Sequence, residues 1–286
     1  MEIQVINYGT AQYPVAVEQA HKPPKQLFYR GDLAAIMERR RVAIVGSRRM
    51  GPYGREVTAK LARELAEQGI VVVSGLALGV DAEAHRAAVE AGGLCLAILP
   101  TPVDQIAPIS NRRLAGQILS GGGALLSQYP PGSEVHKGNF VARNELVAAL
   151  SEVLVITEAT HDSGSLHTAN FAADMQTEVM AVPGAITSPL SQGTNALIRA
   201  GKAGVVTSSQ DVLHALGIYQ MQSPRIPQGS TPEEQQILAL LATDMHDGEA
   251  LLQASRQPVQ VFNQTLTMLE IAGKIMPLGA NRWGLP

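Results

Sequence analysis

Short apolar runs alternate with segments of helical spacing from residue 42 to residue 217. Wholly apolar runs bounded by turn residues are typical of strands that are buried on both faces of a sheet. Between them, apolar residues such as Val57, Leu61 and Leu65 recur every four positions, which predicts helices. The pattern therefore predicts an α/β fold with a mostly parallel sheet. The predicted strands cover residues 42–45, 70–73, 94–99, 124–127, 153–156, 178–182 and 205–206.

Turns of small residues follow several of these strands. In a doubly wound sheet the carboxyl ends of parallel strands share one edge, and ligands bind there. Backbone N–H groups at such turns, together with a guanidinium group, suit a phosphate. We therefore predict an anion-binding groove at this edge, although each turn alone also fits ordinary helix capping, and Arg48 could instead pair with Glu56. The turn residues are Gly46, Ser47, Arg48, Ser74, Gly75, Ser163, Gly164 and Ser165.

Other residues are candidates for the same groove. Arg143 and Asn144 are expected to start a helix over residues 140–150 and to face this edge, where Asn144 bonds a base edge or holds the loop. Phe140 either stacks on one base or packs in the core. Asp81 is expected to cap its helix or to orient the neighbouring turn. Lys202 is a weaker candidate for a phosphate contact.

Composition limits the kind of ligand. The net charge of −3 over 286 residues provides no global basic field, so a site for a polyanion has to be local. Aromatic residues make up 4% of the chain, which argues against a broad stacking platform. We therefore expect few bound bases, mostly backbone contacts and little sequence specificity.

The sequence offers no catalytic constellation. No nucleophile stands beside a base in a convincing setting, and the seven histidines are scattered. The single cysteine, Cys95, lies in the apolar run 94–99 and is expected to be buried, without a disulfide partner. Neither a signal peptide nor a membrane-spanning run is evident, which predicts a cytoplasmic protein. We therefore expect neither an enzyme nor a metal or other cofactor.

The two ends of the chain differ from this central part. Residues 1–41 form a lead-in that is expected to cover an edge or face of the sheet, with Arg39-Arg40-Arg41 as a solvated strand end. Residues 219–230 read as a linker. Residues 231–286 predict three short helices and a hairpin, a winged-helix pattern, with three basic and six acidic residues. Because a groove-reading helix brings positive charge, this domain is predicted to be a protein-interaction or regulatory module.

Several motifs occur in order along the chain. Together they resemble the DprA/Smf family, the DNA-processing proteins of natural transformation, and the last helices resemble the winged-helix domain of many members. The motifs are VGSRRMGPYG (45–54), VSGLALGVDAEAHRAAVEAGG (73–93), GALLSQYPPG (123–132), NFVARN (139–144), EATHDSGSLHTA (158–169), VPG (182–184) and GTNALI (193–198).

The resemblance implies an extended Rossmann-like domain, here residues 42–218, with helices on both faces of the sheet. It implies binding of single-stranded DNA and a homodimer that delivers incoming strands to RecA and relieves the block by single-strand-binding protein. No catalytic turnover is implied. The sequence departs from the family where basic or tyrosine–proline residues are usual, and each lost phosphate contact is expected to flatten the salt dependence by roughly 0.7 log units per log unit of salt. The departures are at Leu78, Glu145, Thr160, Asp162 and 105–108.

Two other functions remain open. Rossmann-like relatives bind nucleotides, and some phosphoribohydrolases carry a PGG-x-GT-x-x-E signature. Here Pro183-Gly184-Ala185 and Gly193-Thr194-Asn195 lie apart and lack the glutamate, which disfavours the hydrolase but leaves a nucleotide-sensing protein possible. The third hypothesis is a scaffold with weakened DNA binding.

Overall fold

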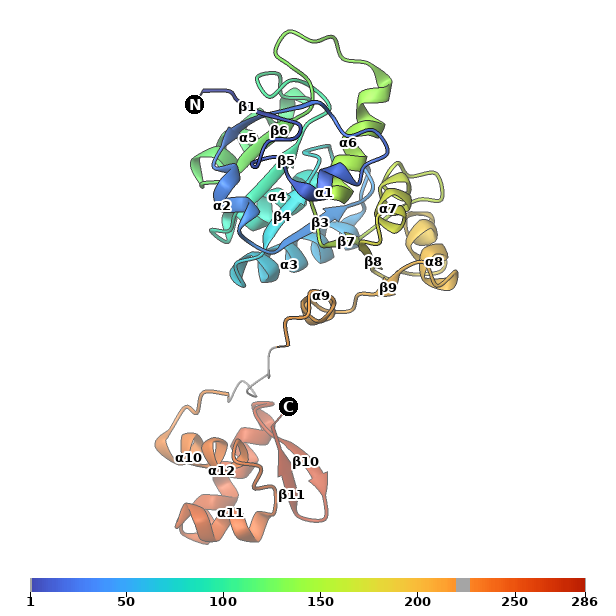
Figure 1. Cartoon of the computed structure of the whole chain (residues 1–286). Coiled ribbons are helices and arrows are strands. Elements are labelled where there is room, and N and C mark those ends of the chain that lie inside the picture. Colours follow the sequence, from blue (N-terminus) through green and yellow to red (C-terminus); the bar gives the residue numbers. More distant parts are fainter. Residues whose placement is uncertain (1, 220–226, 286) are drawn as a thin grey trace. The chain divides into compact units, whose positions relative to one another are not determined.

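The computed structural model describes residues 2–219 and 227–285, so most of the predicted linker (219–230) lies outside the described residues. The chain divides into two compact units, Met1–Tyr219 and Gln220–Pro286 (Figure 1). Each unit has its own cluster of buried apolar side chains. The two units are therefore described separately.

The first unit is built on a nine-stranded sheet, which confirms the α/β prediction. Its strands are β1 (Gln4–Asn7), β2 (Gln26–Gly31), β3 (Arg41–Val45), β4 (Val71–Ser74), β5 (Cys95–Ile98), β6 (Ala124–Ser127), β7 (Val153–Ile156), β8 (Glu178–Ala181) and β9 (Gly204–Val205). The order is β1-β2-β6-β5-β4-β3-β7-β8-β9, and β3 to β9 run parallel. The chain builds outward from β3 to β6 and then returns to place β7 on the other side of β3. The strand order therefore reverses between β3 and β7, the switch point where such folds bind ligands.

Helices cover both faces of this sheet (Figure 1). Because side chains alternate along a strand, Val42 and Ile44 pack on one face of β3, and Ala43 and Val45 on the other. The first face is covered by α3 (Pro52–Glu67), α4 (Val80–Glu90), α5 (Arg112–Ser120) and α9 (Ser209–Ala215). The second is covered by α1 (Val15–Glu18), α2 (Leu33–Met37), α6 (Lys137–Ala149) and α7 (Ser165–Asp174), while α8 (Gln192–Arg199) packs beside β8. No helix of the described ranges has the length and apolarity to cross a bilayer.

The N-terminal lead-in is part of the sheet itself. β2 pairs antiparallel with β6, with Phe28 opposite Ser127, and β1 pairs with the outer side of β2. In β1 one residue of four is buried, so its pattern of apolar and polar residues does not predict a strand. The lead-in therefore extends the sheet edge as well as covering part of one face.

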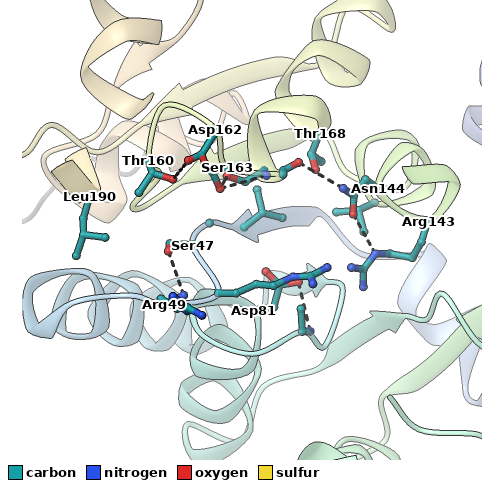
Figure 2. Close-up of a pocket in the computed structure, with 17 residues that line it drawn as sticks. Ser47, Arg49, Asp81, Arg143, Asn144, Thr160, Asp162, Ser163, Thr168 and Leu190 are labelled. Atoms are coloured by element: carbon teal, nitrogen blue, oxygen red, sulfur yellow. Dashed lines mark hydrogen bonds between the residues drawn. The ribbon is translucent and has the colours of Figure 1, made fainter. Parts of the chain in front are cut away.

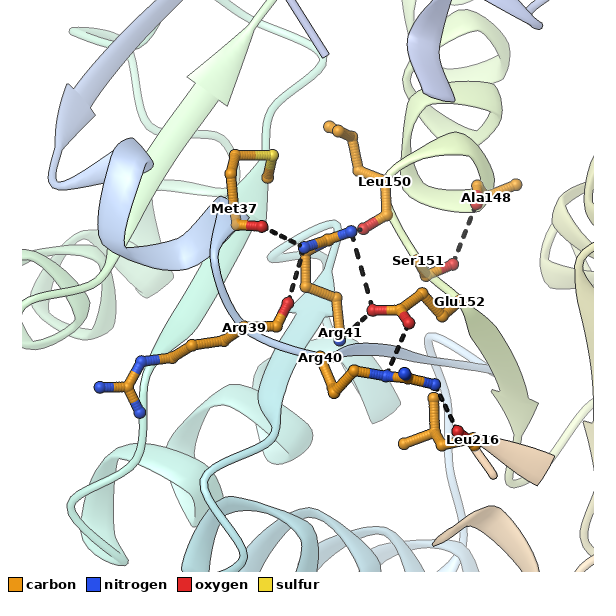
Figure 3. Close-up of polar contacts among 9 residues, drawn as sticks. All are labelled: Met37, Arg39, Arg40, Arg41, Ala148, Leu150, Ser151, Glu152 and Leu216. Carbon is orange, nitrogen blue, oxygen red and sulfur yellow. Dashed lines mark hydrogen bonds and ion pairs between the residues drawn. The ribbon is translucent and has the colours of Figure 1, made fainter. Parts of the chain in front are cut away.

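The expectation that Arg39-Arg40-Arg41 is a solvated end is wrong for Arg41, and Arg40, although exposed, is also bonded to the protein (Figure 3). Arg40 Nε lies 2.7 Å from Glu152 Oε2, and its guanidinium also donates to the carbonyl of Leu216. The Arg41 guanidinium donates to carbonyl oxygens of Met37 and Leu150 at 2.9 and 3.1 Å. These bonds join the ends of α2, α6 and α9 to the start of β3. The Arg39 side chain extends into solvent, and that of Arg40 stays half-exposed.

The second unit has the predicted winged-helix pattern. It contains α10 (Pro232–Leu241), α11 (Gly248–Ser255), α12 (Val259–Ile271), β10 (Met276–Gly279) and β11 (Arg282–Gly284). Thr231 caps α10 by accepting the Glu234 N–H at 3.2 Å. Its core is formed by apolar residues of all three helices, among them Ile237, Leu251 and Phe262.

Candidate nucleic-acid interface

A hollow of about 530 Å³ opens at the carboxyl ends of β3 and β7 (Figure 2). Its walls are the turn after β3, the middle of α6, and the loop after β7 with the first turn of α7. It therefore lies at the switch point of the sheet, as the strand order requires. The prediction of a shared groove at this edge has its structural counterpart here.

Two exposed arginines stand on the turn after β3. Arg48 has no ion pair within residues 2–219 and 227–285, so the alternative partner Glu56 is not used. Its guanidinium carbon lies 5.4 Å from the centre of the Phe140 ring, a cation–π distance. Arg49 is also exposed, and its backbone N–H donates to Ser47 Oγ at 3.1 Å. Both guanidinium groups are therefore free to meet an anion.

The backbone of this turn is already committed to the protein. Ser47 N–H donates to the Glu158 carbonyl at 2.7 Å, and Ser47 O accepts the Val80 N–H at 3.1 Å. A Cβ on Gly46 would lie 2.6 Å from the same Glu158 carbonyl. Gly46 is thus required for close packing, and the turn presents side chains, not the Ser47 amide, to a ligand.

The first turn of α7 forms the opposite wall. Ser163, Gly164 and Ser165 all line the hollow, and the two serine hydroxyls lie 2.8 Å apart. The N-cap residue Gly164 has no side chain, and the Ser165 N–H donates to Ser163 Oγ at a long 3.4 Å. The positive end of the helix dipole faces the arginine turn. Thr168, which the sequence reasoning missed, lines the same wall. The i, i+3 spacing from Ser165 is the signal that finds it.

Asp162 brings negative charge to this wall. It accepts a hydrogen bond from Thr160 Oγ1 at 2.7 Å, and that bond lowers the pKa of its carboxyl below the ordinary value. The carboxylate is therefore ionised at neutral pH. Both residues line the hollow, so these two departures from the family pattern do fall in the candidate site.

The turn after β4 is held in place by the side chain of Asp81. Asp81 accepts the N–H groups of Gly75 at 3.1 Å and Ala77 at 3.5 Å, which fulfils the predicted orienting role. Between them Leu76 adopts a left-handed φ of +54°, which few leucines do. Ser74 is fully buried and donates to the Ile44 carbonyl at 2.7 Å. The expectation that Ser74 lines the groove is therefore not met.

Arg143 lies in the middle of α6, because this helix begins at Lys137, three residues before the predicted start. Its side chain is buried, and its guanidinium donates to the carbonyls of Gly75 and Ile98 (the latter at 3.1 Å) and to Asn144 Oδ1. Burial lowers the pKa of Arg143 and raises that of Asp81, and each charge partly offsets the shift of the other. Arg143 therefore lines the hollow, but its main role is to hold the turn after β4 in place.

The remaining candidates, Phe140, Asn144 and Lys202, lie in three different places. Phe140 borders a second, apolar hollow of about 220 Å³, which Leu78 also lines. Asn144 lines the main hollow and donates to the Gly164 carbonyl at 3.4 Å. Lys202 stands two residues before β9, so it lies at the amino edge of the sheet, and it does not line the hollow. Glu145 turns to His21, whose Nδ1 is 2.8 Å away, and does not line the hollow.

Glu158 is a polar residue of this region that the sequence reasoning missed. Its side chain is buried, and Oε2 accepts the N–H of Gly51, the N-cap of α3, at 2.7 Å. A carboxylate of the protein therefore already occupies the amino end of α3, where a bound phosphate is usual in strand–turn–helix units. The available signal was an acid two residues after the buried strand at 153–156.

The other titratable groups of interest are buried and neutral. Burial lowers the pKa of His85 to about 4 and raises that of Cys95 to about 12. Cys95 is a free, buried cysteine, as predicted. Among the described residues, no three His, Cys, Asp or Glu side chains are grouped as metal ligands.

The fold and the hollow define an extended Rossmann-like binding protein with a basic turn facing a helix N-terminus. Residues 4–217 match the family described as DNA recombination-mediator protein A, and residues 221–281 match the DprA winged helix domain. The chain belongs to the DprA family, also called Smf, so the resemblance seen in the sequence is confirmed.

Relatives and solved structures agree with this assignment. The chain is 34% identical to DNA processing protein DprA of Bacillus subtilis (75% of this chain and 71% of the relative) and 34% identical to Protein Smf of Escherichia coli (92% and 72%). It superposes on DprA of Streptococcus pneumoniae with a TM-score of 0.69 and 37% identity (75% and 74% covered). DprA of Helicobacter pylori, whose structure concerns its single-stranded DNA binding mode, gives 0.68 and 34% (76% and 96%).

Proposed function

We propose that this protein binds single-stranded DNA by its backbone in the hollow between the arginine turn and α7. The observation that carries the proposal is the pair of exposed arginines, Arg48 and Arg49, which have no ion pair in the described ranges and face the serine-lined first turn of α7. Cationic side chains and a helix N-terminus are both phosphate ligands. The Helicobacter pylori relative, described by its single-stranded DNA binding mode, supports this ligand class.

The apolar hollow beside Phe140 supports a single strand over a duplex. It adjoins the main hollow through Arg48, Ala77 and Arg143, which line both. A phosphate at Arg48 would therefore leave its base next to an apolar recess. Only an unpaired base can turn away from its own strand in this way.

Glu158 argues against the nucleotide-sensing alternative. A Rossmann-type nucleotide site uses the amino end of the first helix for phosphate. Here the carboxylate of Glu158 holds that position through the Gly51 N–H. A nucleotide phosphate placed there would meet a buried negative charge.

In the cell, we propose that the protein is a cytoplasmic homodimer that protects incoming single strands, passes them to RecA and relieves the block by single-strand-binding protein. This role rests on the family, whose members are named for DNA processing and recombination mediation. It requires no catalytic turnover and no cofactor. The dimer is tested by sedimentation velocity, and RecA delivery by strand exchange on coated single strands.

The ligand is tested by anisotropy titrations of labelled oligothymidine, a duplex of equal length and a labelled ATP analogue, at low and moderate salt. We expect the single strand to bind more tightly than the duplex. We also expect its affinity to fall with salt by roughly 0.7 log units per log unit for each phosphate held. Absence of single-strand binding at low salt would refute the proposal, and binding of the ATP analogue alone would establish the nucleotide alternative.

A further inference from the structure

The winged-helix unit contains a groove of about 340 Å³ between α11, α12 and β11. In DNA-reading helix-turn-helix domains, the second helix of the pair enters the major groove with basic residues on its outer face. Here α12 contains neither lysine nor arginine. Its exposed positions hold amide, hydroxyl, acidic and apolar side chains. This surface has the location of a DNA reader without its charge.

The groove combines an apolar floor with a polar rim. Phe262, Leu266 and the ring of Trp283 line its floor. Its rim includes Glu249, an exposed carboxylate without an ion pair in the described part of the chain, and Asn263. A second acid, Glu270, follows Thr267 of the rim by three positions and shares its face of α12.

Within residues 227–285, the basic side chains do not neutralise this rim. Lys274 is engaged with Glu234, whose Oε2 lies 3.1 Å from its Nζ. Arg282 neighbours Trp283 on β11 and so points to the other side of that strand. Arg256, the C-cap of α11, does not line the groove, to which this helix contributes Gly248, Glu249 and Leu252. The groove therefore keeps a net negative charge.

We propose that this groove binds a basic segment of a partner protein. A lysine or arginine side chain would place its charge at Glu249 and its alkyl stem on the apolar floor, where the Trp283 ring adds a cation–π contact. Charge complementarity selects this occupant. Residues 231–286 hold three basic and six acidic residues, a net charge of −3, which repels both duplex DNA and a second copy of the unit.

Trp283 makes the groove directly observable, because it is the only tryptophan in the chain. Its fluorescence in the full-length protein is followed while a peptide of alternating leucine and arginine is added. We expect a saturable change, and none with the same peptide carrying glutamate in place of arginine. Glu249→Gln is expected to weaken binding about tenfold, as the loss of one charge-assisted hydrogen bond predicts.

Glu233→Gln is the matched control, because it removes the same charge from an exposed position on α10 outside the groove. It is expected to leave peptide affinity unchanged, while Thr267→Arg, which places a cation in the groove, abolishes binding. Equal effects of Glu249→Gln and Glu233→Gln would mean unspecific attraction and would overturn the proposal. No response to the arginine peptide, or displacement of the peptide by duplex DNA, would overturn it as well.

Discussion

Two arginines near the site have the same charge but different surroundings. Arg48 is exposed, lies over the ring of Phe140 and has its donors free for a ligand. Arg143 is buried, and its donors are satisfied by the carbonyls of Gly75 and Ile98. Burial separates a residue that can bind a phosphate from one that holds a turn in place.

Arg143→Ala is predicted to lower the free energy of unfolding by about 3 kcal/mol, because buried carbonyls and the charge of Asp81 lose their partner. Arg48→Ala removes only exposed contacts and is expected to change it by less than about 0.5 kcal/mol. Urea denaturation followed by circular dichroism measures both. An Arg143→Ala protein of normal stability that fails to bind a single strand would instead make Arg143 a direct ligand.

His85 predicts a loss of stability in acid. Burial holds its pKa at about 4, below the ordinary 6.5, so the unfolded chain binds its proton first as the pH falls. The stabilisation is complete above pH 6.5 and is lost progressively toward pH 4, by up to about 3 kcal/mol. The raised pKa of Asp81 acts in the opposite direction.

The measurement is the free energy of unfolding of wild type, His85→Leu and the exposed control His167→Leu between pH 7 and pH 4.5. We expect His85→Leu to flatten the pH dependence and His167→Leu to leave it unchanged. Parallel curves for wild type and His85→Leu would assign the acid sensitivity to other groups.

At the scale of elements, the helix N-terminus that is open to a ligand follows β7, not the first main strand β3. The amino end of α3 is filled by Glu158, whereas the amino end of α7 opens into the hollow. The sequence pattern predicts both turns as parts of one groove and does not distinguish between the two helix ends. The contact between residues 51 and 158 depends on the pairing of β3 with β7, which no local pattern reveals.

Gly54→Ala tests this arrangement. The added Cβ would lie 2.5 Å from Glu158 Oε2, so the carboxylate or the helix has to move, and we expect a loss of about 1 to 3 kcal/mol in stability. Gly116→Ala in α5, where nothing lies within 4 Å, is the matched control and is expected to stabilise by up to about 1 kcal/mol. Thermal unfolding compares them. A neutral Gly54→Ala would contradict the tight fit of Glu158.

At the scale of the whole molecule, the buried parallel strands were predictable to within about a residue, because each is an uninterrupted apolar run. The strands β1, at the sheet edge, and β2, beside it, were not, since each buries only some of its residues. Polar residues were placed less well. Ser74 and Ser163 both precede a glycine, yet Ser74 turns into the core toward Ile44 and Ser163 into the hollow. Whether such a serine is buried or faces the hollow depends on tertiary packing, which the local sequence does not reveal.

The central claim is that the switch-point hollow holds the backbone of a single strand through its arginine turn. The most direct measurement is the affinity of labelled oligothymidine for wild type, Arg48→Glu and Arg39→Glu at low salt. Arg39 is exposed at the opposite, amino edge of the sheet. Arg39→Glu is therefore the control, because it makes the same change of charge away from the hollow. The account predicts a loss of more than about tenfold for Arg48→Glu and little change for Arg39→Glu. Equal losses, or none for Arg48→Glu, would contradict it.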